Sequence, residues 1–309
     1  MIILLLFTIV SSVRSIDRPS VKIPELGTVK GIYHNDASLF LGIPYAETPG
    51  RFEKSRAKKS LGDEFQAYRY GDICIQPNNK LLPMSEDCLF LNVGVPRNTS
   101  AQNLSVLVWI HGGGYTDGSS TIYPMTNLVS RSNGTAIVVT LNYRLNIFGY
   151  LFTGKTPSNI GMLDQRLALQ WVSKYIVAFG GDPNKVTIFG ESAGGNSVCF
   201  HLATQESMPY YRGAIIESGL YDEGAMSEKI ATKHYNEILN LTACEDFSCL
   251  KNLPVSDYIT LLNTDLKQKD WVRNNEQFAF CTRKKNTTTR ILFRDPLWMV
   301  YLLLIRQKT

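Results

Sequence analysis

The 309-residue chain is 44% hydrophobic and 19% charged, which provides enough apolar material for a sizeable core and is compatible with one large α/β domain. This composition excludes a fibrous or disordered protein. The formal net charge is +5, or +4 if Arg14 is lost with a leader (31 basic and 27 acidic residues), and no long cluster of Lys and Arg is present. We therefore expect no nucleic-acid partner.

The N-terminal segment is typical of a secretory leader. Residues 1–10 are almost entirely apolar, and small polar residues follow that could contain a cleavage point near Ser15. A membrane anchor is the alternative, but a spanning helix requires ~20 residues, about twice this run. We expect residues 1–15 to be a signal peptide and no transmembrane span to remain after its cleavage. Five sequons support a secreted, extracellular glycoprotein, although each tripeptide also arises by chance: Asn98, Asn103, Asn133, Asn240 and Asn286.

The first part of the mature chain predicts short strands. Gly27–Tyr33 and Ala37–Ile43 alternate like antiparallel strands, with a polar turn between them. Residues 51–87 are rich in charge, Pro and Asn and predict a surface loop. Strand character resumes at Cys88–Val93.

The middle of the chain predicts a doubly wound, mostly parallel sheet of the α/β class. Ser105–Ile110, Ala136–Val139 and Ala214–Ile216 are nearly continuous apolar runs, which suit parallel strands covered on both faces. Helical spacing between the strands favours right-handed crossovers. We expect the sheet to end at Ala214–Ile216 with an unpaired edge. The apolar stripe of the main helix is Leu163, Leu167, Trp171, Tyr175, Ala178 and Phe179.

Two further helices are expected after the last strand. Met226, Ile230, Ala231, Tyr235 and Ile238 form one apolar stripe, and Val255–Leu262 forms a second, shorter helix after Pro254.

The segment Gly190–Gly194 fits G-x-S-x-G, the nucleophile elbow. An elbow needs a strand before the serine, a helix after it and small neighbours, because the sharp turn strains the backbone of the serine. Lys185–Phe189 has the character of a buried strand, and Gly195–Thr204 has helix-compatible apolar spacing. The motif alone arises often by chance, but this context makes Ser192 a candidate nucleophile.

A second motif lies directly after a predicted strand. His111–Gly114 follows Ile110, and glycines allow a backbone to approach a substrate closely. Together with the N–H of Ala193, this segment gives the HGGG oxyanion arrangement of esterases and lipases. The alternative is an ordinary glycine-rich turn.

Six cysteines are compatible with a few disulfides in a secreted enzyme. Cys74 and Cys88, and Cys244 and Cys249, are close enough in sequence to close small loops, although any of them could be a buried thiol. Cys199 is expected to be buried and unpaired. Cys281 has no obvious partner.

With these motifs the chain resembles the type B carboxylesterase and cholinesterase family from about Gly27 to about Leu262. The matching stretches are FLGIPYAETPGRF from Phe40, SEDCLFLNV from Ser85, VWIHGGGY from Val108, NYRLNIFGY from Asn142, GMLDQRLALQWV from Gly161 and FGGDPNKVTIFGESAGG from Phe179.

The resemblance implies that residues 16–281 are the N-terminal part of an α/β-hydrolase domain that uses no cofactor or metal. It implies that Ser192 forms the acyl-enzyme, and that Gly113, Gly114 and Ala193 donate to the oxyanion. It also implies two disulfides, Cys74–Cys88 and Cys244–Cys249, and two ion pairs, Arg51–Glu86 and Arg144–Asp164.

The general base is the difficulty. The family places its acid and its histidine further downstream than this chain extends, so we expect a truncated protein that is inactive alone. The four histidines are poor substitutes: His34 and His111 precede the serine, His201 is out of reach on the departing helix, and His234 fits a packed helix residue. Residues 282–309 diverge from the family, and their apolar run Leu297–Ile305 is too short to span a bilayer.

Two functions remain open. The first is hydrolysis of small carboxylic esters through an acyl-Ser192 intermediate. General esters are favoured over choline esters, because the loop Cys74–Cys88 contains no aromatic residue that could bind a quaternary ammonium. The second is a non-catalytic, cholinesterase-like adhesion or binding protein, which the missing base favours and the intact Ser192 disfavours.

Overall fold

The computed structural model describes residues 17–77, 79, 81–97, 101–219 and 227–264, together with the backbone of two strands at 289–292 and 300–305. The expected signal peptide, the sequons at Asn98 and Asn286, and Cys281 lie outside the described residues.

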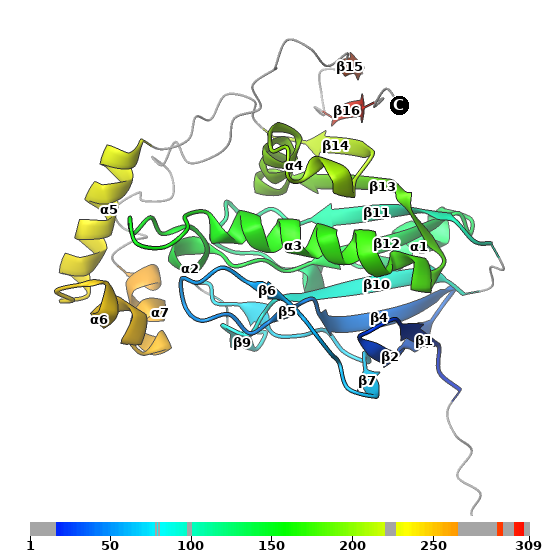
Figure 1. The fold of residues 1–309 in the computed structure, drawn as a ribbon, viewed down its shortest axis with the longest axis horizontal. Helices are drawn as coiled ribbons and strands as arrows, with labels where there is room; N and C mark the ends of the chain where they lie inside the picture. Colours follow the sequence, from blue (N-terminus) through cyan, green and yellow to red (C-terminus); the bar gives the residue numbers. More distant parts are fainter. Residues whose placement is uncertain are drawn as a thin grey trace, which may run out of the picture.

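The main sheet has a parallel centre, as the apolar runs predict. Within the described residues, its strand order is β15-β16-β14-β13-β11-β12-β10-β4-β3 (Figure 1). Strand β11 pairs in parallel with β12 and β13, and β13 pairs in parallel with β14. The four central strands are β11 (Leu104–Ile110), β12 (Ala136–Leu141), β13 (Gly181–Glu191) and β14 (Gly213–Glu217).

The N-terminal flank of the sheet is antiparallel. Strand β10 (Phe90–Pro96) pairs with β12 and with β4 (Ala37–Pro44), and β4 pairs with β3 (Ile32–His34). The prediction of one strand over Gly27–Tyr33 is wrong, because β2 (Gly27–Lys30) lies in a separate sheet between β1 (Ser20–Ile23) and β7 (Glu64–Gln66). The break falls at Gly31, where a Cβ atom would lie 2.3 Å from the Leu39 carbonyl oxygen.

The prediction of a plain surface loop over residues 51–87 is also incomplete. Besides β7, this segment contains three two-residue strands: β6 (Arg56–Ala57), which pairs with β5 (Ala46–Glu47), and β8 (Ile73–Cys74), which pairs with β9 (Met84–Ser85). Strands this short carry no periodicity that a sequence could show.

The expected unpaired edge at the C-terminal side of the sheet is wrong. The backbone of β16 (Val300–Ile305) pairs antiparallel with β14, and β15 (Thr289–Leu292) pairs antiparallel with β16. The sequence reasoning tested the apolar run near residue 300 only as a membrane span. A run of this length also suits a strand.

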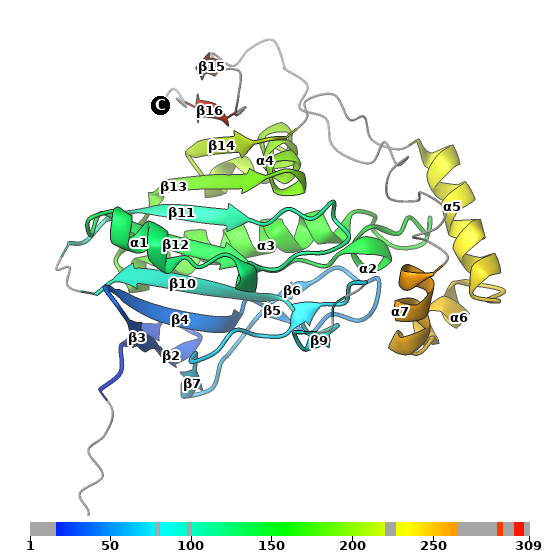
Figure 2. The same cartoon turned by 180° about the vertical axis from the view of Figure 1, so that it is seen from behind.

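Helices cover both faces of the sheet (Figures 1 and 2). Helix α1 (Thr126–Arg131) packs on the face that Val138 lines, through Met125 and Val129. Helices α3 (Ile160–Tyr175) and α4 (Ala193–Ala203) pack on the other face with Ile137 and Val139, since alternate residues of a strand point to opposite faces.

The buried face of α3 differs from the predicted stripe. Leu163 and Leu167 are only half-buried, whereas Asp164 and Gln165 are completely buried. The prediction assumed that buried positions are apolar, and these two polar side chains are hydrogen-bonded inside the protein instead. Short 3-10 helices η1 (Ser120–Ile122), η2 (Ile176–Phe179) and η3 (Met208–Tyr210) complete this region.

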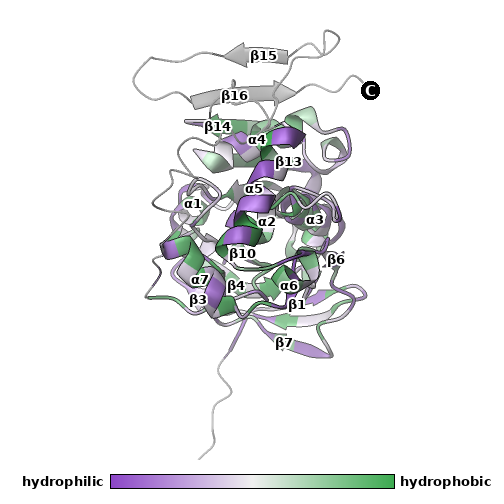
Figure 3. Ribbon diagram, turned by 90° about the vertical axis from the view of Figure 1, so that its left-hand side faces the viewer, coloured by the Kyte–Doolittle hydropathy of each residue, from purple (hydrophilic) through white to green (hydrophobic). Residues whose placement is uncertain are grey.

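A second hydrophobic cluster lies at one end of the sheet. It joins α2 (Asn146–Tyr150), α5 (Glu228–Leu241), α6 (Phe247–Asn252) and α7 (Val255–Asn263). Both helices expected after the last strand are present as α5 and α7, but Ile230 of the predicted stripe is exposed and Met226 lies outside the described residues. In Figure 3 this end faces the viewer and α5 is largely hydrophilic, in agreement with its only two buried residues, Tyr235 and Ile238. No helix among the described residues is long and apolar enough to cross a membrane.

Two ion pairs connect these parts, and both confirm the pairs that the resemblance implies. Arg144 Nε lies 2.7 Å from Asp164 Oδ2, and both side chains are buried. Arg144 also donates to the Glu53 carbonyl at 2.7 Å. Arg51 pairs with Glu86 at 2.7 Å and donates to the Leu253 carbonyl, which fastens the end of α6 to the main domain.

Replacing Asp164 by Asn should destabilise the fold by about 3–5 kcal/mol, because Arg144 is left as an uncompensated buried charge. Urea unfolding followed by circular dichroism measures the loss. The control is Lys174→Gln, which removes an exposed ion pair with Glu25 and should change the midpoint little. Equal effects of the two substitutions would show that the buried pair has no special role.

Candidate active site

Ser192 occupies a sharp turn between β13 and α4. Its backbone angles are φ 55° and ψ −122°, a region that side chains other than glycine rarely adopt. The Ser192 N–H donates to the Glu217 carbonyl at 2.9 Å, and the Ser192 carbonyl accepts from Asn196 N–H at 2.9 Å. The neighbouring strand and the following helix therefore fix both sides of the strained residue.

The glycines of the elbow are required by close backbone contacts. A Cβ atom on Gly190 would lie 2.6 Å from the Ile110 carbonyl oxygen, and one on Gly194 would lie 2.1 Å from the same atom. A Cβ atom on Gly195 would lie 2.8 Å from the Glu217 carbonyl oxygen. The elbow thus packs directly against the carboxyl end of β11.

The glycine loop, residues 111–118, lies against the elbow. A Cβ atom on Gly112 would lie 2.6 Å from the Glu191 carbonyl oxygen and 3.3 Å from Ser192 Cβ. Gly113 and Gly114 have φ +107° and +58°, conformations that glycine adopts without strain. The Gly113 carbonyl accepts from the N–H groups of Thr116 and Asp117 at 3.0 and 3.1 Å, which closes the loop.

The three backbone N–H groups expected to form the oxyanion hole have no acceptor among the described residues. In the described part of the chain, the N–H groups of Gly113, Gly114 and Ala193 donate no hydrogen bond to protein. Ala193 is the first residue of α4, where helix geometry leaves the N–H without an intrahelical acceptor and the helix dipole favours negative charge.

His111 is a structural member of the glycine loop. It is completely buried, its ring stacks on Tyr143 with centroids 4.4 Å apart, and its Nδ1 lies 2.8 Å from the Gly112 carbonyl oxygen. Burial lowers the pKa of His111 to about 4, so the ring is neutral at pH 7. Its contacts fix the start of the loop and do not reach Ser192.

His201 is also a structural residue. Its Nε2 lies 3.1 Å from Gln165 Oε1 and its Nδ1 lies 3.0 Å from Ser207 Oγ. Because Gln165 Nε2 donates to Ser197 Oγ, Gln165 Oε1 must accept, which places the His201 proton on Nε2. Burial lowers the pKa of His201 to about 3. The prediction that His201 does not serve as the base agrees with these contacts.

No described histidine is hydrogen-bonded to the Ser192 hydroxyl. His34 is exposed on β3, and His234 lies on α5, beyond the end of the sheet toward which the parallel strands point (Figures 1 and 2).

Carboxylates surround the elbow, and the sequence reasoning did not identify them as a group. Glu191 and Glu217 are partners in the parallel register of β13 and β14. Burial and the charge of Glu191 raise the pKa of Glu217, and burial raises the pKa of Asp117 in the glycine loop. The pKa of Tyr123 is raised by burial and by the charges of Glu191 and Asp117. Carboxyl groups are therefore present on the elbow, on the neighbouring strand and in the glycine loop.

The remaining candidate residues are placed as follows. The structure joins Cys74 to Cys88 and Cys244 to Cys249 in disulfides. Cys199 is a completely buried thiol. Of the expected glycosylation sites, the described ones are all exposed: Asn103, Asn133 and Asn240. No group of three or more potential metal ligands occurs among the described residues.

A strained serine between a parallel strand and a helix, faced by a glycine loop at the end of the adjacent strand, defines an α/β-hydrolase. The chain belongs to the carboxylesterase family, whose profile matches residues 17–287.

Relatives and solved structures agree with this assignment. The chain is 40% identical to an acetylcholinesterase of Electrophorus electricus over 243 residues, which covers 71% of this chain and 38% of that protein. It is 44% identical to the para-nitrobenzyl esterase of Bacillus subtilis over 211 residues, which covers 63% of this chain and 42% of that enzyme. A PNB esterase structure matches with a TM-score of 0.75 and 36% identity over 84% of this chain and 56% of that chain. The chain thus spans less than two thirds of the length of these relatives.

Because histidines are buried in a neutral form, we expect the stability of the fold to depend on pH. The unfolded chain binds protons at histidine below about pH 6.5, whereas burial keeps His201 neutral to about pH 3, so stability falls as pH decreases through this window. Each such group contributes a slope of about 1.4 kcal/mol per pH unit. Replacing His201 by Gln should reduce the slope of the unfolding free energy against pH between pH 6 and 4.5. The reduction should be about 1.4 kcal/mol per pH unit, which corresponds to one proton.

Urea unfolding at several pH values measures this difference. Between pH 7.5 and 8.5 the two proteins should show the same slope, which is the internal control. An unchanged slope between pH 6 and 4.5 would contradict the neutral, buried state of His201.

Proposed function

We propose that the chain is a serine esterase of the secretory pathway, with Ser192 as the nucleophile. Ser192 Oγ attacks the carbonyl carbon of an ester and loses its proton to a base. The N–H groups of Gly113, Gly114 and Ala193 stabilise the oxyanion of the tetrahedral intermediate. The alcohol then leaves with a proton, and water hydrolyses the acyl-serine to release the acid.

The observation that carries this proposal is the contact between the elbow and the glycine loop. The 3.3 Å between Ser192 Cβ and the position of a Cβ on Gly112 brings a serine and three unengaged N–H groups to the same edge of the sheet. Of these donors, Ala193 is buried, where an N–H group without an acceptor costs free energy, whereas Gly113 is half-buried and Gly114 is exposed.

The base sets the expected rate. None of the four histidines, all of which the structure describes, is hydrogen-bonded to Ser192, so we expect slow acylation and little ester turnover by this chain. The strained turn and the N–H donors supply the remaining catalysis, and mutational studies of other serine hydrolases attribute about 10³–10⁴-fold to such donors and binding.

The substrate is expected to be a neutral small ester. When ionised, Glu191, Glu217 and Asp117 would repel an ester with a negative charge near its carbonyl group. The disulfide loop 74–88 contains no aromatic residue for a quaternary ammonium. Among its relatives, the para-nitrobenzyl esterase is therefore the better guide to substrate class than the acetylcholinesterase.

Two observations support the secretory route. Disulfides persist in oxidising compartments, and the structure contains two of them. The described sequon asparagines are exposed and so accessible for glycosylation.

A second function is favoured by a specific observation. Since no described histidine contacts Ser192, the fold could serve as a cholinesterase-like binding or adhesion protein without turnover. The reactivity of Ser192 separates the two proposals.

A fluorophosphonate probe should label the chain at Ser192, slowly compared with a complete esterase, and the adduct is located by peptide mass spectrometry. Ser192→Ala should abolish labelling because the attacking oxygen is lost. Ser197→Ala serves as a second serine control on the same helix, since its hydroxyl is buried and donates to the Ala193 carbonyl at 2.9 Å.

Labelling of folded protein at another residue, or none after prolonged incubation, would exclude the esterase mechanism and favour the binding function. Hydrolysis of a neutral para-nitrophenyl ester that Ser192→Ala abolishes would establish turnover.

A further inference from the structure

Three amide side chains join segment 72–76, which contains the first cysteine of the Cys74–Cys88 disulfide, to the glycine loop and the residues that follow it. Asn142 Nδ2 donates to the Asp72 carbonyl, while its Oδ1 accepts from Ser120 N–H. Asn146 Nδ2 donates to the Ile75 carbonyl at 2.7 Å, and its backbone N–H donates to the Tyr115 carbonyl at 2.6 Å. The third is Gln76.

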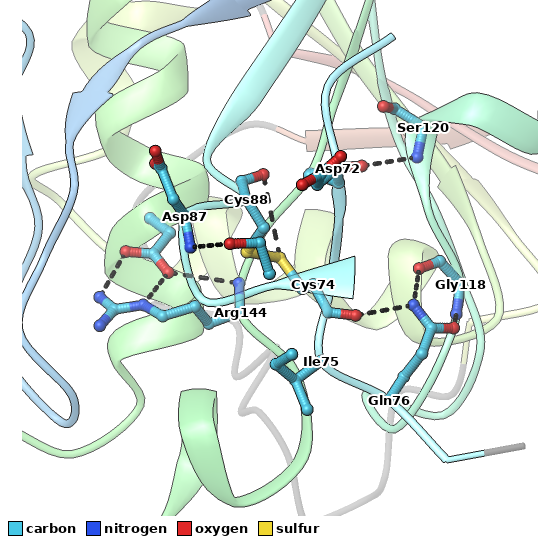
Figure 4. The surroundings of a disulfide bond; sticks show 12 residues. Asp72, Cys74, Ile75, Gln76, Asp87, Cys88, Gly118, Ser120 and Arg144 are labelled. Carbon is cyan, nitrogen blue, oxygen red and sulfur yellow. Dashed lines mark hydrogen bonds and ion pairs between the residues drawn. A yellow bond between two sulfur atoms is a disulfide. The ribbon is translucent and has the colours of Figure 1, made fainter. Parts of the chain in front are cut away.

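Gln76 makes the most direct of these connections (Figure 4). Its Nε2 donates to the carbonyls of Cys74 and Gly118, both at 3.0 Å, and its Oε1 accepts from Gly118 N–H at 3.0 Å. The side chain therefore satisfies both backbone groups of Gly118, and only 6% of its surface is exposed. Within this contact, an amide is needed because Gly118 presents one donor and one acceptor.

Gly118 passes this restraint to the candidate oxyanion donors. A Cβ atom on Gly118 would lie 2.5 Å from the Gly112 carbonyl oxygen and 2.6 Å from His111 Nδ1. Gly118 thus packs against the two residues that begin the glycine loop. The loop cannot shift at Gly112 without moving Gly118, and Gly118 is fastened to Gln76.

We propose that Gln76 is a positioning residue that holds the glycine loop, and through it the N–H groups of Gly113 and Gly114, at the place where the oxyanion forms. The disulfide segment is the fixed point from which Gln76 acts. The catalytic part of this inference rests on the proposed esterase function, whereas the structural part does not.

Two substitutions separate the two parts. Gln76→Met keeps the length of the side chain and removes every hydrogen bond to Gly118. Gln76→Glu keeps the acceptor for Gly118 N–H, but when ionised it places a negative charge against the carbonyls of Cys74 and Gly118. When protonated, the introduced carboxyl again has one donor for these carbonyls.

Hydrogen exchange tests the structural part in the full chain. In Gln76→Met, the hydrogen-bonded backbone amides of Thr116, Asp117 and Gly118 should exchange at least tenfold faster than in the unchanged chain. The matched control is Gln170→Met on α3, whose amide donates only to the Tyr210 hydroxyl. Unchanged exchange in the glycine loop of Gln76→Met would overturn the proposal, whatever the reactivity of Ser192.

The fluorophosphonate labelling rate tests the catalytic part. Gln76→Glu at pH 8 should label Ser192 about 10–100-fold more slowly, since misplacement of the donors by about 1 Å costs this much. The saturating rate should fall, while the probe concentration at half-saturation stays constant. Relative to the unchanged chain at each pH, the rate should recover as the introduced carboxyl is protonated. Gln76→Met should be slow at all pH values, and Gln170→Glu should label normally.

The outcomes are distinct. Faster exchange with an unaltered labelling rate would show that Gln76 only stabilises the loop and would overturn its positioning role. A slow rate for Gln76→Glu without recovery at low pH would attribute the defect to general misfolding and would also overturn it. Failure of the unchanged chain to label would reject the esterase function, while the exchange data would still decide whether Gln76 holds the loop.

Discussion

The close approach of the elbow to the end of β11 is the constraint on which the site depends. The backbone at Gly190 and at Gly194 lies so close to the Ile110 carbonyl oxygen that neither position has room for a side chain. Because β11 continues directly into the glycine loop, the same contact sets the distance between Ser192 and the candidate oxyanion donors. The strained conformation of Ser192 is maintained by hydrogen bonds to strand β14 and helix α4.

Buried polar side chains, and not only apolar packing, position the elements around this turn. On one side, Gln165 of α3 donates to Ser197 of α4 and lies against His201, which aligns the two helices. On the other, Asn92 contacts Gly42, Ser120 and Thr140 and so ties three strands to the residues after the glycine loop. Buried groups of this kind stabilise a structure only when each donor and acceptor is satisfied, so they specify one arrangement of the layers.

The sequence predicts the centre of the fold better than its edges, for physical reasons. Strands β11, β12 and β14 are covered on both faces, so they form apolar runs that stand out in the sequence. The elbow and the glycine loop could be found because their steric demands restrict the residue type at several adjacent positions. The β8–β9 bridge and the pairing of β16 depend on partners far along the chain, and no local pattern encodes them.

The polar part of the site illustrates the same limit. The predicted stripe of α3 contains only apolar residues and so omits Asp164 and Gln165, whose partners Arg144 and His201 lie on other elements. Gln76 lies in a segment that reads as a surface loop, and its contact with Gly118 spans 42 residues. A single sequence can reveal a group that a backbone conformation requires, but it cannot reveal a group that only a distant partner requires.

The two chemical tasks of the proposed site, oxyanion stabilisation and proton transfer, differ in the same way. Stabilisation of an oxyanion needs N–H groups whose positions are set by backbone turns, and here those turns follow β11 and β13, which are adjacent in the sheet although β12 lies between them in sequence. Proton transfer needs a side chain at hydrogen-bond distance from Ser192, and its placement depends on a distant segment. On the proposed function, the described residues would therefore supply the oxyanion donors independently of the base. Reactivity toward a phosphonate, which forms such an adduct, and turnover of an ester, which also requires repeated proton transfer, are thus separable properties of this fold.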